Sequence, residues 1–207
     1  MALIIQIILL TPIMLFAITI HEYSHGKAAL SLGDPTAKNA GRITLNPISH
    51  LDPLGAICLL FFHFGWAKPV PVNVLYFKNK QRDIIIMALS GPVSNISAAF
   101  VAGLFLRYYD LNIFLYQFLL GYMIVLNVGL GLFNLLPIPP LDGSLVLENI
   151  LPTWLREKYL KYTKYAPYLL IGIVLADNFL HTGIIDSVLG TPIKIVVNFI
   201  GGKEILK

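Results

Sequence analysis

Two histidines and a glutamate near the start of the chain have the spacing of a zinc-dependent hydrolase. They lie in the motif His21-Glu22-Tyr23-Ser24-His25, which follows eighteen uncharged residues from Leu3 to Ile20. Residues four apart in a helix lie about 400° apart around its axis, so both imidazoles project from one face and can bind the same zinc ion. Glu22 lies about 100° round the helix, where it can take a proton from zinc-activated water. The motif therefore predicts hydrolytic chemistry.

A catalytic zinc needs a further protein ligand, and six residues are serious candidates. These are His50, His63, His181, Asp110, Asp142 and Asp177. Asp142 is the strongest because it follows an uncharged run of thirty-one residues that ends with prolines at 137, 139 and 140. Prolines interrupt the hydrogen-bond ladder of a helix, and such a break makes room for a metal and a substrate strand. The alternative is that Asp142 only caps the helix that follows it.

The composition indicates that these residues belong to a membrane protein. Of the 207 residues, 57% are hydrophobic and 13% are charged. A water-soluble domain of this composition would lack the polar residues that its surface needs. The net charge of +4, with basic residues in loops, favours lipid headgroups over nucleic acid. We predict an all-α multi-pass membrane protein with a single membrane-embedded domain, residues 1–207.

Four apolar segments predict spanning helices, and a fifth is too short to cross. The four are Leu3 to about Leu30, Ile84 to Leu106, Leu111 to about Leu136, and Tyr165 to about Ile185, which Asp177 interrupts. The fifth, Pro53 to Ala67, has fifteen uncharged residues, fewer than the roughly 20 that span about 30 Å. We predict a helical bundle of about four to five spanning helices, with short strands and a re-entrant hairpin within Ala37–Phe77. The stretch Ser187–Lys207 is predicted to lie at the membrane interface.

The basic residues predict an orientation. If Pro53–Ala67 does not cross, only Arg107 faces one side before the C-terminal tail, and eleven basic residues share the other side. These eleven are Lys27, Lys38, Arg42, Lys68, Lys78, Lys80, Arg82, Arg156, Lys158, Lys161 and Lys164. Such a bias is typical of the cytosolic side. The same topology brings His25 and Asp142 to one side, because an even number of crossings then separates them.

Other polar residues in the predicted helices are interpreted as packing. Gly91-Pro92 is predicted to kink its helix, and Asn95 is predicted to pair across helices. Asn127 is typical of close helix packing. Asn134 lies about two turns before Asp142, so its amide could reach the site, but interhelical packing is an alternative.

Three motifs together carry a family resemblance. His21–His25, Ser90-Gly91-Pro92-Val93-Ser94-Asn95 and Asn134–Gly143 resemble the three-helix core of the site-2 protease family of intramembrane metalloproteases. The resemblance covers about residues 5–150, which would form the catalytic core, with C-terminal helices over 151–207. It implies one Zn²⁺ per chain, held by His21, His25 and Asp142. It also implies that Glu22 is the catalytic base and that Asn134 contacts the substrate or the oxyanion.

The expected activity is hydrolysis of a peptide bond within or next to a transmembrane helix of a membrane-protein substrate. The expected location is the cell membrane, with the active site nearer the cytosolic side. The lipid bilayer is a further partner, nucleic acid is not expected, and a homo-oligomer is compatible with the sequence. Two other classes stay open, a zinc or proton transporter and a catalytically inactive membrane scaffold. A transporter has no need for Glu22 beside paired histidines, and intact candidate ligands argue against a scaffold.

Overall fold

Most of the described chain folds into helices and none of it forms a named strand, which confirms the all-α prediction. The computed structural model describes residues 2–62, 65–109, 111 and 113–202. The helices are α1 (Ala2–Ser31), α2 (Thr36–Asn39), α3 (Pro53–Phe62), α4 (Lys80–Tyr108), α5 (Phe114–Asn134), α6 (Asp142–Ile150), α7 (Thr153–Thr163), α8 (Ala166–Leu180) and α9 (Thr191–Gly201). Short 3-10 turns cover Pro47–His50 and Val74–Tyr76, and a π-helical turn covers Asp186–Gly190. Two candidate ligands, His63 and Asp110, lie outside the described residues.

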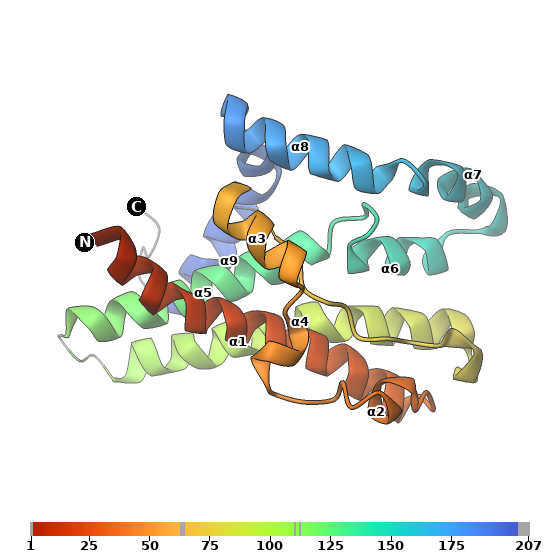
Figure 1. The fold of residues 1–207 in the computed structure, drawn as a ribbon, viewed down its shortest axis with the longest axis horizontal. Helices are drawn as coiled ribbons and strands as arrows, with labels where there is room; N and C mark the ends of the chain where they lie inside the picture. The colour runs from red at the N-terminus through yellow and green to blue at the C-terminus, as the bar shows by residue number, and fades with distance from the viewer. Residues whose placement is uncertain (1, 63–64, 110, 112, 203–207) are drawn as a thin grey trace.

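The three long helices α1, α4 and α5 pack against one another lengthwise (Figure 1). Small residues on α4 permit this close approach, since Ala88, Gly91 and Ala99 are all buried. The helix α9 packs against α4 and α5. The three helices share an apolar core in which Val197 and Ile200 of α9 are buried. The sequence analysis did not predict this packing of the C-terminal segment.

Two of the described helices are long and apolar enough to cross a membrane. These are α4, with 29 residues, and α5, with 21 residues. The apolar helix α8 has 15 residues, about 22 Å of rise, which is short of a hydrocarbon core of about 30 Å. It stops at Leu180 because the chain turns there, where Asp177 accepts hydrogen bonds from the Thr182 hydroxyl (2.8 Å) and the Ile184 N–H (2.7 Å). The number of four to five spans therefore stays a prediction.

The predicted strands between α1 and α4 do not form in the described part of that segment, which holds a single antiparallel bridge between Leu51 and Ala67. Prolines at 47, 69 and 71 remove backbone donors, so a ladder of strand pairing cannot be built there. Neighbouring N–H groups bind carboxylates instead of a partner strand. The short α3, with ten residues, is about 15 Å long and cannot cross, which agrees with the sequence prediction for this segment.

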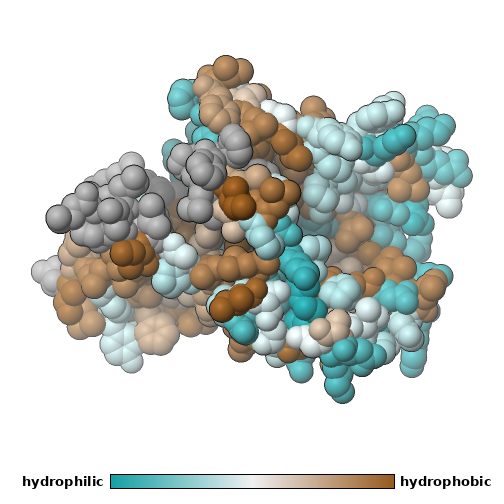
Figure 2. Space-filling model, in the orientation of Figure 1, coloured by the Kyte–Doolittle hydropathy of each residue, from teal (hydrophilic) through white to brown (hydrophobic). Residues whose placement is uncertain are grey.

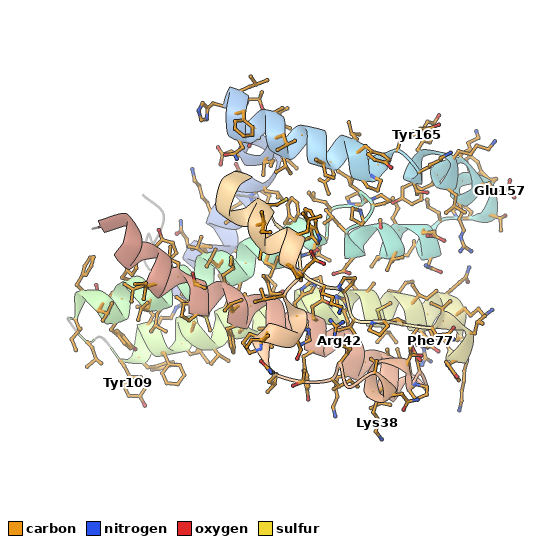
Figure 3. The ribbon with its side chains drawn as sticks, viewed as in Figure 1. Lys38, Arg42, Phe77, Tyr109, Glu157 and Tyr165 are labelled. Carbon is orange, nitrogen blue, oxygen red and sulfur yellow. The ribbon has the colours of Figure 1, made fainter. Side chains whose placement is uncertain are left out.

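The two ends of the bundle differ in polarity. Lys38, Arg42 and Phe77 lie at one end, and Tyr109 lies at the other (Figure 3). Hydrophilic residues gather on the surface at the first end, and hydrophobic residues dominate the coloured surface of the other half (Figure 2). The helices α4 and α5 run in opposite directions, and the start of α6 lies near the middle of the bundle, from where α6 runs toward the polar end (Figure 1).

Candidate metal centre

Three side chains from two distant parts of the sequence converge where α1, α4 and the start of α6 pack together. Asp142 Oδ2 lies 3.1 Å from His21 Nε2 and 3.2 Å from His25 Nε2, and the two nitrogens are 3.1 Å apart. Tetrahedral zinc with bonds of about 2.0–2.1 Å holds its ligand atoms roughly 3.3 Å apart. Within the described ranges, this is the one group of three ligating side chains that could hold a metal ion.

The hydrogen bonds of the two imidazoles fix which nitrogen faces the centre. His25 Nδ1 lies 2.8 Å from the Met87 carbonyl oxygen, and His21 Nδ1 lies 2.7 Å from Asn95 Oδ1. Both partners are acceptors, so each neutral ring carries its proton on Nδ1 and presents a lone pair at Nε2. The two Nε2 atoms and Asp142 Oδ2 therefore direct lone pairs at one point, where a bound cation would stabilise them.

Asp142 contributes the negative charge. Its Oδ2 is buried and has no hydrogen-bond donor, as expected of an oxygen meant for a metal. Asp142 is the first residue of α6, and the N-cap residue before it, Leu141, gives that helix no side-chain capping hydrogen bond. The Asp142 carboxylate faces the two imidazoles, and the three residues fit a divalent cation such as zinc.

Two glycines let the backbone come close enough to build the centre. A Cβ on Gly91 of α4 would lie 2.4 Å from His25 Nε2 and 2.8 Å from His21 Nε2. A Cβ on Gly143 would lie 2.1 Å from the Leu135 carbonyl oxygen, so the turn after α5 folds tightly back onto its own helix. That turn contains the three predicted helix-breaking prolines, and it aims Asp142 at the histidines.

Two buried asparagines, Asn95 and Asn127, form a hydrogen-bonded pair behind the metal-facing side of the His21 ring. The Asn95 amide nitrogen donates to the Ala17 carbonyl and to Asn127 Oδ1, both at 2.9 Å, which leaves its own oxygen for His21. Asn127 donates in turn to the Met123 carbonyl (2.9 Å). The prediction that Asn95 pairs across helices is confirmed, but its contact with His21 was missed. The spacing offered a signal, because Asn95 lies four residues after Gly91 and shares its helix face.

Glu22 lies beside the three ligating side chains but contacts a different partner. Its Oε2 accepts a hydrogen bond of 2.9 Å from the backbone N–H of Val70. The carboxylate is thus bound by the Val70 N–H and is not one of the three converging groups, as the helical spacing predicts. The sequence analysis did not identify Val70.

The other predicted site residues lie elsewhere or bind other groups. His50 is buried, and its Nε2 lies 2.8 Å from the Thr44 carbonyl oxygen. Asp177 holds the end of α8, and His181 directly follows that helix. The Asn134 amide donates to the Leu130 carbonyl of its own helix (3.0 Å). The structure therefore brings together His21, His25 and Asp142 from the sequence candidates that it describes.

Comparisons with known proteins show what this chain is similar to. The model of peptidase family M50 matches residues 111–176. YwhC of Bacillus subtilis, named for a predicted zinc metalloprotease activity, is 42% identical over 162 residues, 73% of each chain. This chain belongs to the site-2 protease family, peptidase family M50. No solved structure matches the chain.

More distant members of the site-2 protease family are also similar. Rip2 of Mycolicibacterium smegmatis is 30% identical over 141 residues, 65% of this chain and 54% of Rip2. Rip2 of Mycobacterium tuberculosis is 26% identical over 172 residues, 79% of this chain and 65% of Rip2. Both carry names for a predicted zinc metalloprotease. The protein is accordingly a zinc metalloprotease of this membrane-associated family, and the three converging side chains suit its Zn²⁺.

Proposed function

We propose that the protein is an intramembrane protease that hydrolyses a peptide bond within or next to a transmembrane helix of a membrane-protein substrate. The observation that carries this proposal is the convergence of His21, His25 and Asp142, with Glu22 next to His21 in the chain, among long apolar helices. We further propose that α1 crosses the membrane with α4 and α5, in a multi-pass bundle of four to five spans within one domain. The polar end then faces the cytosol, as the basic residues at that end suggest.

In this proposal each side chain has one role. His21, His25 and Asp142 hold one Zn²⁺, which when bound supplies Lewis acidity for water and for the scissile carbonyl. Glu22 takes a proton from the attacking water as the new C–O bond forms, and it gives that proton to the amine as the C–N bond breaks. Asn95 fixes the orientation and tautomer of the His21 ring. Asn134 contacts the substrate or the oxyanion once its amide leaves the Leu130 carbonyl.

A cleavage assay in lipid vesicles tests this function directly. The purified chain is reconstituted in lipid vesicles with a panel of single-span membrane proteins, with and without a zinc chelator, and mass spectrometry maps each cut. We expect cleavage within or next to the span, near the cytosolic end, that chelation abolishes and added Zn²⁺ restores. Cuts in extramembrane domains alone, or cleavage indifferent to chelation, would contradict the proposal.

A further inference from the structure

A proline-rich segment, Lys68–Asn73, lies against the face of α1 that carries Glu22. Pro69 and Pro71 have no N–H group, so Val70 supplies the single backbone donor of this tripeptide, and Glu22 accepts it at 2.9 Å. The Val70 side chain is buried at 8% exposure. It packs on Gly26, one helical turn beyond Glu22, where a Cβ would lie 3.2 Å from Val70 Cγ1. The position of this segment therefore decides where the Glu22 carboxylate is held.

A buried carboxylate outside the metal centre fixes the far end of the segment. Asp34 is fully buried, and its Oδ2 accepts the Asn73 N–H at 2.7 Å. Its Oδ1 accepts the N–H of Thr36 (2.9 Å) and also the Thr36 hydroxyl. Alternating prolines favour an extended chain with three residues per turn, in which the N–H groups of residues 70 and 73 point to the same side. Two carboxylates, Glu22 and Asp34, thus bind one side of the segment.

Charge and backbone contacts fix the near end. The Arg42 guanidinium donates to the Lys68 carbonyl (2.8 Å), and the Lys68 N–H donates to the His50 carbonyl (2.9 Å). Burial raises the pKa of Asp34, but the hydrogen bonds from Thr36 and Asn73 outweigh burial and lower this pKa below its usual value. Asp34 is therefore an ionised anchor for the segment.

We propose that Asp34 is a positioning residue for the catalytic base, acting through Asn73 and the Val70 N–H on Glu22. One carboxylate oxygen of Glu22 is fixed by the Val70 N–H, and the other is left to exchange a proton with water. Without the Asp34 anchor the segment shifts and Glu22 loses its fixed orientation. This inference rests on the proposed function.

The test is the variant Asp34→Asn, which keeps the shape of the side chain but turns an NH₂ group toward one of the two backbone N–H groups. Steady-state cleavage of a reconstituted transmembrane substrate is measured with the zinc-loaded protein over a range of substrate concentrations. We expect kcat to fall about tenfold, since small misplacement of a catalytic group is costly, while KM and zinc content stay unchanged. The variant Asp34→Asn combined with Glu22→Gln should cleave no more slowly than Glu22→Gln alone, because Asp34 acts only through Glu22.

The matched control is Asp177→Asn, which alters a carboxylate with the same kinds of donor, a threonine hydroxyl and a backbone N–H, at the end of α8. It should leave kcat unchanged. If Asp34→Asn does not fold, Gly26→Ala replaces it, because the new Cβ presses on Val70, and the same kinetic pattern is expected. Unchanged kcat, lost zinc, or an equal further loss in the Glu22→Gln background would overturn the inference. Full activity of Glu22→Gln alone would instead overturn the proposed function.

Discussion

Glu22→Gln is expected to lower kcat for cleavage of a transmembrane substrate by about 100- to 10,000-fold, the usual contribution of a general base. The amide oxygen of glutamine can still accept the Val70 N–H, which Glu22 accepts at 2.9 Å, so the local structure should persist. The amide cannot take a proton from water, so the chemistry alone is lost. The measurements are the steady-state cleavage rate at saturating substrate and the metal content, and one zinc should remain bound per chain.

The control for Glu22→Gln is Glu157→Gln, the same substitution at an exposed position of α7. It should cleave at the rate of the unmodified protein. Loss of zinc in Glu22→Gln would place Glu22 among the ligands, and unchanged cleavage would remove its role as base. A zinc or proton transporter would move its ions in lipid vesicles regardless of any peptide cleavage, so a transport assay on the same vesicles separates that class.

Gly91→Ala is expected to weaken zinc binding by about 100-fold, the upper end of effects seen when groups around metal ligands are changed. The new methyl group would lie 2.4 Å from His25 Nε2 and 2.7 Å from His21 Cε1. Contacts this short force the rings away from Asp142, so the three ligating atoms can no longer meet at one point. Zinc affinity is measured by competition with a chelator of known affinity, and cleavage should fall in parallel.

Gly172→Ala is the matched control, because a Cβ at this position of α8 meets nothing within 4 Å. Both substitutions replace a helical glycine with a better helix former, so a difference between them isolates the contact with the imidazoles. Zinc affinity in Gly91→Ala equal to that of Gly172→Ala would mean that the metal does not lie between these rings.

The metal ligands could be predicted from the sequence, but most of the residues that surround them could not. Two residues four apart, such as His21 and His25, lie on one face of any helix, and prolines such as those before Asp142 interrupt any helix. The pairing of the histidines and the helix break before Asp142 could therefore be predicted. The contact of Gly91 with the imidazoles and the Val70 N–H on Glu22 depend on how distant segments pack, which no spacing encodes. Asp34 was missed for the same reason, because its partner Asn73 lies 39 residues away.

The fold likewise divides into helices that the local sequence predicts and contacts that depend on packing between distant segments. Long apolar runs predicted α1, α4 and α5 to within a few residues at most ends, because helix formation satisfies the backbone locally. The strands predicted around Val70 were wrong, because β-branched residues favour strands only where their N–H groups can pair. The packing of α9 on α4 was missed because it depends on the small residue Gly103, which Ile200 covers.

X-ray absorption at the zinc edge, on the purified protein and on Asp142→Ala, tests most directly whether three residues hold one zinc. For the unmodified chain we predict one zinc with two imidazole nitrogens and oxygen ligands at about 2.0–2.1 Å. Asp142→Ala should lose most of its zinc and change the spectrum of what remains. Equal zinc content and an identical spectrum in the two proteins would contradict a site built from His21, His25 and Asp142.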